Sequence, residues 1–173
     1  MVLVEVNGNY TDAEPMKNKT EGVLIKAYQT MWMRLTASGA VKPTTHLLDN
    51  EASAALKEEI RKNCSIQLVL PDNHQWNLAK QAIQMFKSHS KAVLVGVDDT
   101  FPLRLWDRLL RQMVLTQNLL QQSNVMPTVS AYLYINGAFD YNKMPLAPMG
   151  CAVQIHISNK RRGTWAANVT DGW

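Results

Sequence analysis

The sequence has few cysteines and no long apolar run. Its two cysteines, Cys64 and Cys151, lie far apart, form no CxxC pair and show no zinc-ligand spacing with the four histidines. No apolar stretch approaches the roughly 18 residues that cross a bilayer. The start, MVLVEVNGNY, has neither the basic region nor the long apolar region of a signal peptide. These absences predict an intracellular protein, nuclear or cytoplasmic, with free thiols and no contact with a membrane.

Signature loops of common enzyme classes are also missing. The chain has no Gly-rich phosphate loop and no GxSxG segment. Of its 173 residues, 46% are hydrophobic, and 18 Lys and Arg exceed 14 Asp and Glu to give a net charge of +4. This composition excludes a disordered chain and suits one globular domain with an appendage. The mildly basic charge permits a polyanionic partner without requiring one.

The first part of the chain alternates strand and helix patterns. Asn7-Gly8-Asn9 supplies a turn between two extended runs, which predicts a β-hairpin over residues 1–16. Apolar residues then recur at helical spacing from Glu21 until Gly39, with Thr20 as the N-cap. The segments that follow are a strand at Thr44–Leu48, a helix at Ala52–Lys62 and a strand at Ile66–Leu70. This alternation predicts an α/β sheet with helices packed on it.

The second part is helical and then irregular. Helical spacing predicts one helix over Trp76–Val95 and a longer one over Pro102–Gln122. One seam of the longer helix is formed by Leu103, Trp106, Leu110, Met113, Gln117 and Leu120. That seam packs either on the domain's own sheet or on a partner helix. Because residues 123–173 are rich in Pro and Gly, with a strand-like run at Cys151–Ile157, we predict a core domain over 1–122 and a linker plus the start of a small β element over 123–173.

A carboxylate follows one of the predicted buried strands. Asp49 stands at the strand's carboxyl end and Asn50 comes next. In open α/β sheets, ligands and catalytic groups gather at such ends. Asp49 can bind Mg²⁺ if further carboxylates converge on the ion, or it can simply cap the following turn.

A polar stripe runs along the predicted helix 76–95. Lys80, Gln84, Lys87 and Lys91 fall within about 60° of one another on a helical projection. A different face, suited to the core, carries Ala79, Ile83 and Phe86. The lysine stripe is either a solvated face or a surface that contacts a phosphate backbone.

Several segments together resemble a known family. The run from Val2 to Pro15, a helix, and then Thr45-His46-Leu47-Leu48-Asp49-Asn50-Glu51 resemble strands 2 to 4 of the integrase catalytic core of retroviruses and LTR retrotransposons. The segment from His74 to Ile83 resembles the stretch that carries an Asn and, three residues later, the catalytic Glu. Met126-Pro127 to Tyr134 and then Pro148 to Val153 are similar to the region after the core in copia-type elements.

This resemblance implies a ribonuclease-H-like mixed sheet with flanking helices, and an active site of three carboxylates that binds Mg²⁺. The second metal-binding Asp matches Asp49, whereas the Glu position, counted from Asn77, falls on Lys80. Strand 1, which would carry the first Asp, is missing. Because an ammonium group cannot replace an anionic ligand of Mg²⁺, Asp49 and Lys80 are predicted to be vestigial catalytic positions that bind metal weakly or not at all. The other acidic candidates are predicted to be solvated or turn carboxylates: Glu5, Asp12 and Glu51.

The sequence therefore predicts a truncated, catalytically inactive integrase core of a retrotransposon that binds DNA without sequence preference. The predicted DNA contacts are Asn50, His74, Asn77, Lys80, Gln84, Lys87 and Lys91, with Lys160, Arg161 and Arg162 as further phosphate contacts. One alternative is a non-enzymatic interaction or dimerisation module built on helix 102–122, which overlaps with the homodimer that integrase cores commonly form. Another is an active nuclease that uses other carboxylates, but no second strand-end acid joins Asp49.

Overall fold

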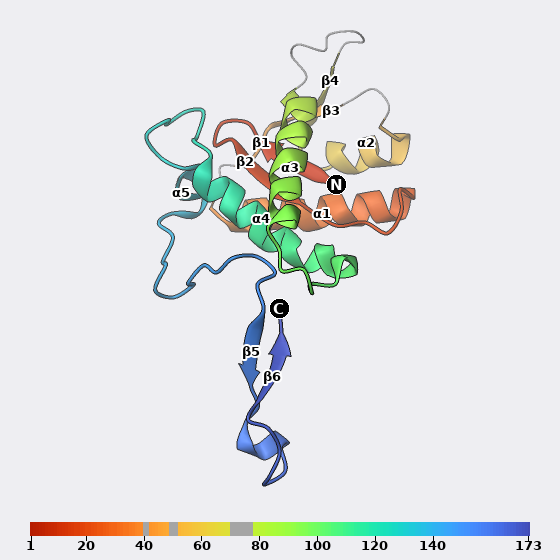
Figure 1. The fold of residues 1–173 in the computed structure, drawn as a ribbon. Coiled ribbons are helices and arrows are strands. Elements are labelled where there is room, and N and C mark those ends of the chain that lie inside the picture. Colours follow the sequence, from red (N-terminus) through yellow and green to blue (C-terminus); the bar gives the residue numbers. More distant parts are fainter. Residues whose placement is uncertain (40–41, 49–51, 70–77) are drawn as a thin grey trace.

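A computed structural model of the chain describes residues 1–39, 42–48, 52–69 and 78–173. In Figure 1, helices pack around two short strand pairs, and a third strand pair leads away from them. Among the described helices, none is long and apolar enough to cross a membrane.

The N-terminal hairpin has the predicted form. Strands β1 (Val2–Glu5) and β2 (Tyr10–Ala13) pair antiparallel, with Val2 opposite Ala13. The turn places Asn9 at a φ of 55°, a conformation that Asn tolerates better than most residues. The carboxylate of Glu5 accepts the backbone N–H groups of Asn7 and Gly8. The predicted hairpin and the predicted turn role of Glu5 are both confirmed.

Strands and helices then alternate as expected. Helix α1 (Glu21–Ala37) follows Thr20 and ends before Gly39, whose φ of 87° stops the helix. It is followed by β3 (Thr45–Leu48), α2 (Ala54–Arg61) and β4 (Ser65–Leu68). Strands β3 and β4 pair parallel through the crossover helix α2. Each boundary lies within two residues of the predicted one.

Two apolar clusters lie on either side of the hairpin. Leu3 joins one cluster and Ala13 joins the other, because successive side chains of a strand point to opposite faces. The buried residues of the first cluster are Leu3, Tyr28, Met31, Trp32, Leu35, Leu56, Ile60 and Ile135. Those of the second are Ala13, Phe86, Phe101, Leu109, Leu110, Met113 and Val114. The hairpin is therefore held between α1 and α2 on one side and α3 and α4 on the other.

The long predicted helix is divided in two. A 3₁₀ turn, η2 (Leu103–Leu105), precedes helix α4 (Trp106–Leu120). Only the middle of the predicted seam, at Leu110, Met113 and Gln117, is buried. Of the two alternatives for the seam, packing on the domain's own body therefore holds for its middle only, because Leu103, Trp106 and Leu120 are exposed. The 3₁₀ turn has three residues per turn, so the α-helical spacing does not carry through it.

A further helix occupies part of the predicted linker. Helix α5 (Ala131–Asn136) begins at Ser130, whose hydroxyl accepts the N–H of Leu133. It packs on α4 and β2, and Ile135 is buried in the first cluster. The sequence did not indicate this helix, because six residues are too few to give a clear helical period. The division of the chain into two domains at residue 122 stays a prediction.

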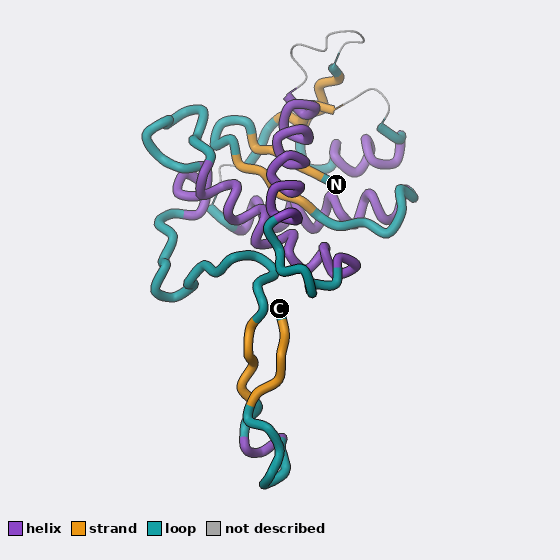
Figure 2. The backbone as a smooth tube through the Cα atoms, viewed as in Figure 1, coloured by secondary structure: helices purple, strands orange, loops and turns teal. Residues whose placement is uncertain are grey.

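The described strands form three separate pairs. The predicted strand Cys151–Ile157 corresponds to β5 (Val153–His156), which pairs antiparallel with β6 (Val169–Gly172) around a 3₁₀ turn, η3 (Asn159–Arg161). Figure 2 shows this strand pair extending away from the helices. The α/β class is confirmed, with both antiparallel and parallel pairs. Within the described ranges, however, β1–β2 and β3–β4 do not join into one continuous mixed sheet.

Candidate nucleic-acid interface

Helix α3 (Leu78–Val95) packs on the body through one face only. Phe86 is buried in the second cluster, and Nε2 of His89 lies 3.1 Å from both the carbonyl oxygen of Met113 and Oγ1 of Thr116. Ala79 and Ile83 were expected on the core face, but both are exposed. The start of α3 extends beyond α4 in Figure 1, and the residues of its first turn, 78–81, are exposed.

The polar stripe of α3 faces away from the core. Lys80, Gln84, Lys87 and Lys91 are all exposed, and on a helical projection they lie roughly opposite His89 and Val93. In the part of the chain that the structure describes, Lys87 and Lys91 form no ion pair with a carboxylate. The stripe is therefore a positively charged surface along the length of α3, which can contact phosphates.

Four of the predicted site residues cannot be placed beside this stripe. Asp49, Asn50, His74 and Asn77 lie outside the described residues. That Asp49 is a vestigial metal position therefore stays a prediction. That these four residues form one surface with Lys80 also stays a prediction.

The described residues do not fit a magnesium site. Across residues 1–39, 42–48, 52–69 and 78–173, no three His, Cys, Asp or Glu side chains gather closely enough to hold a metal ion. Lys80, at the position where the resemblance places a Glu, is an exposed side chain of the first turn of α3. Its ammonium group has no lone pair to offer a cation and repels one.

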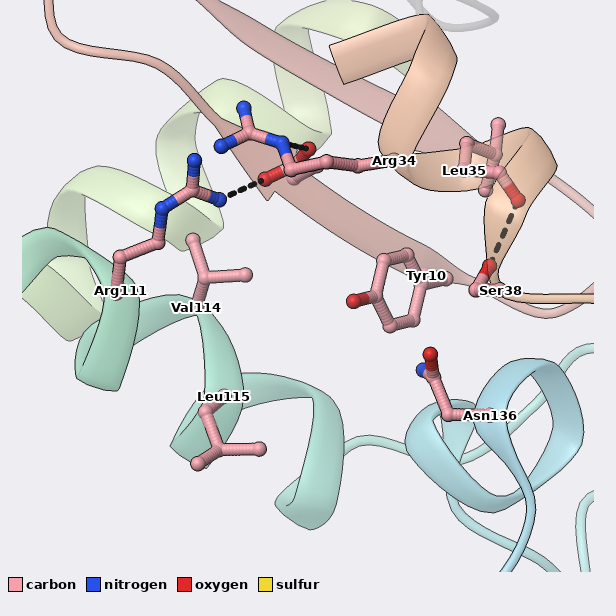
Figure 3. A pocket seen from close by; sticks show the side chains of 9 residues that line it. Tyr10, Arg34, Leu35, Ser38, Arg111, Val114, Leu115 and Asn136 are labelled. Carbon is pink, nitrogen blue, oxygen red and sulfur yellow. Dashed lines mark hydrogen bonds and ion pairs between the residues drawn. The ribbon is translucent and has the colours of Figure 1, made fainter. Parts of the chain in front are cut away.

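A cavity of about 220 Å³ lies between β2, α1, α4 and α5. Its polar wall is an ion-pair cluster in which Nε of Arg34 lies 3.0 Å from Oδ2 of Asp12, and Nη2 of Arg34 lies 2.6 Å from Oε2 of Glu14. Arg111 reaches the same two carboxylates at 3.4 and 3.2 Å. Figure 3 shows Arg34 and Arg111 together, and Tyr10 and Asn136 on another side of the cavity.

The prediction that Asp12 is a solvated or turn carboxylate is wrong. Asp12 is only 3% exposed, because it lies opposite Leu3 in the hairpin, on the face that packs against α1 in the first cluster. Burial raises the pKa of its carboxyl, although the guanidinium of Arg34 opposes the shift. Thr11, Asp12 and Ala13 are buried in succession, so no alternation along this strand signals the burial of Asp12 in the sequence.

This cluster has the character of a structural cross-link. Two arginines balance two carboxylates, and the pairs join β2 to α1 and α4. The Asp12 carboxylate is buried, whereas the Arg111 side chain is 53% exposed, and exposed ion pairs add little stability.

Burial raises the pKa of the Cys64 thiol, which disfavours the nucleophilic thiolate. Both Cys64 and Cys151 are free.

The fold matches a solved structure although the sequence matches none of the known families. No family model and no curated protein sequence matches the chain. The chain is similar to the catalytic core domain of BIV integrase, with a TM-score of 0.56 and 14% sequence identity, over 78% of this chain and 82% of that one. The architecture is therefore that of an integrase catalytic core, a ribonuclease-H-like fold. At this identity, the likeness establishes the fold alone.

Proposed function

We propose that this chain is an integrase catalytic core of a copia-type retrotransposon, which has lost strand transfer and keeps a DNA-binding surface on α3. The observation that carries the proposal is the lysine stripe, exposed along the outer side of a helix in an integrase fold. Its DNA contacts take place in the nucleus or cytoplasm of the host cell.

The chemistry of the stripe favours a phosphate backbone as the partner. Lys87 and Lys91 stand one turn apart, and their ammonium groups are not neutralised by described carboxylates. Cations on a solvated helix gain affinity for DNA by releasing its condensed counterions, and this contact carries no sequence preference. Gln84, about one turn before Lys87, can donate to a further phosphate oxygen.

The residue at the family's Glu position supports loss of catalysis. Lys80 places a cation where the family has a carboxylate ligand of Mg²⁺. A magnesium ion, where an intact family member binds one, would stabilise negative charge on the reacting phosphate. The described residues offer it no carboxylate cluster.

The proposal is tested by titrating the purified chain onto a short fluorescent DNA duplex at several salt concentrations. The double variant Lys87→Glu/Lys91→Glu should bind at least about tenfold more weakly, and the log–log salt slope should fall in magnitude by about 2, one for each lost phosphate contact. Lys26→Glu on α1 is the matched control, because it reverses an exposed helix lysine away from α3. It should leave the slope unchanged.

Two results would contradict this assignment. If Lys26→Glu weakens DNA binding as much as the α3 variant does, DNA is attracted by the net charge of the chain and not by the stripe, which is then only a solvated face. If the wild-type chain processes or joins transposon-end DNA with Mg²⁺, the loss of catalysis is refuted.

A second candidate function is favoured by a different surface. The apolar side chains at the ends of the η2–α4 segment are 61% exposed at Leu103, 44% at Trp106 and 78% at Leu120. Exposed large apolar residues on one segment are typical of a protein-interaction surface. The candidate is a dimerisation or interaction module without a role on DNA.

A further inference from the structure

The β5–β6 arm, residues 153–172, is a two-stranded ribbon that leads away from the helices. Its register pairs Val153 with Gly172 and His156 with Val169, and the N–H of Ile157 donates to the carbonyl of Asn168 beyond the last pair. Every described residue of β5, and all of β6 except Gly172, is exposed. In Figure 1 the tip of the arm is the part farthest from the helices.

The base of the arm is fixed to the body. The indole N–H of Trp173 donates to Oγ1 of Thr100 at 3.2 Å, and its ring meets Phe101 edge-on with centroids 6.4 Å apart. Before the first residue of β5, the carbonyl of Gly150 accepts the N–H of Asp98. Because both ends of the ribbon are held, the body fixes the direction in which the tip points.

The tip carries positive charge and a fully exposed indole. Lys160 and Arg161 are exposed, Arg162 follows them, and Trp165 is 98% exposed. Arg162 donates to the carbonyl of Ala166, which folds the tip back on itself. The arm has one acidic residue, Asp171, near its base. Charge and aromatic surface are therefore concentrated at the end of the ribbon.

We propose that the β5–β6 arm is a second DNA-contacting element, whose ribbon enters the major groove of a duplex while Lys160 and Arg161 contact phosphates and Trp165 packs against the sugar or base edge. This inference rests on the proposed function, since the arm and the α3 stripe would bind the same partner, DNA. The arm is a separate surface from the stripe.

The width of the two-stranded arm and the residues at its tip favour duplex DNA over other polyanions. The major groove, about 12 Å wide, admits a two-stranded β-ribbon. Adjacent cations at the tip match the dense phosphate charge of both groove walls. An anionic membrane would instead be bound by a broad apolar face. Here the apolar Val153 and Ile155 lie in β5, on the base side of the tip, and the tip itself offers a single large apolar side chain, Trp165.

The experiment measures binding of the full chain to a fluorescent duplex of about 24 base pairs across a salt series. The tip variant Lys160→Glu/Arg161→Glu should bind at least about tenfold more weakly, with the log–log salt slope reduced in magnitude by about 2. Trp165→Ala should weaken binding about fivefold or more at an unchanged slope, because it removes contact area and no charge. Arg162 is left intact because it holds the tip together.

Lys143→Glu is the control for the arm, because it reverses an exposed lysine in the loop before the arm. It should bind DNA as the wild type does. Thermal unfolding of the tip variant should also match the wild type, since the anchors at Trp173 and Thr100 are untouched.

The two DNA surfaces can fail separately. If the tip variant binds DNA more weakly, DNA contact by the arm is supported. This holds even if Lys87→Glu/Lys91→Glu has no effect and DNA contact by the α3 stripe is refuted. Unchanged binding by a folded tip variant overturns the arm. If the tip variant loses binding to vesicles containing phosphatidylserine but keeps its DNA binding, the arm is a membrane contact and the DNA assignment is overturned.

Discussion

At the scale of single residues, His46 couples the β3–β4 pair to α1. It is half-buried in β3, and its ring meets Tyr28 edge-on with centroids 5.7 Å apart. Burial lowers the pKa of its imidazole. The neighbouring Tyr28 and Cys64 both have a pKa raised by burial, so neither titrates in the acidic range.

Acid should destabilise the chain through His46. The unfolded chain takes up a proton near pH 6.5, whereas the folded imidazole resists it, so stability is full above this value and is lost as pH falls toward the lowered pKa. Between about pH 7.5 and pH 5, the unfolding midpoint of the wild type should fall by roughly a few degrees more than that of His46→Phe. Thermal unfolding followed by circular dichroism measures this, and equal losses in both proteins would contradict it.

At the scale of elements, α4 is joined to β2 by a side chain that acts as a strand partner. Oδ1 of Asn118 accepts the N–H of Thr11 at 2.8 Å, and Nδ2 of Asn118 donates to the carbonyl of the same residue at 2.7 Å. Asn118 is fully buried. The amide thereby satisfies the backbone of the strand edge that would otherwise be buried without partners.

Replacing this amide should cost stability. Asn118→Leu leaves the N–H and the carbonyl of Thr11 unsatisfied in the interior, which should lower the free energy of unfolding by about 3 kcal/mol. The control is Asn124→Ala, because the Asn124 side chain also donates to a hairpin carbonyl, that of Val6, but at an exposed site. Urea denaturation should separate the two variants, and equal effects would refute the role of Asn118.

At the scale of the whole molecule, exposed apolar residues gather along η2 and α4 beside the packed body. Leu105 is 37% exposed, in addition to Leu103 and Trp106. An integrase fold carrying such a surface is suited to self-association. The homodimer and the interaction module of the second candidate would share this surface.

A charge on this surface should weaken a dimer. We expect the wild type to show a concentration-dependent dimer, and Trp106→Glu to dissociate at least about tenfold more readily, because the buried face of a dimer excludes an unpaired carboxylate. Analytical ultracentrifugation measures both proteins. Lys87→Glu/Lys91→Glu is the matched control and should dimerise as the wild type does. A wild type that stays monomeric at all concentrations would exclude this surface as an interface.

What the sequence determined by itself was local. The turn at Asn7-Gly8-Asn9, the stop of α1 at Gly39 and the lysine stripe of α3 follow from backbone preference and helical period, which depend on neighbours in the chain. The order of these elements also indicated the α/β fold, which the likeness to the BIV integrase core supports. Local pattern was least informative where elements were short, as at α5.

Only the tertiary structure decided which polar groups are buried and which elements stand apart. Aspartate is usually a surface residue, yet Asp12 is buried. Its partners Arg34 and Arg111 lie on α1 and α4, which are distant from Asp12 in the sequence. The basic residues 160–162 lie at the tip of a ribbon because β6 pairs with β5 and the ring of Trp173 packs against Phe101. In both cases the outcome depends on contacts between residues far apart in the sequence, which local spacing does not report.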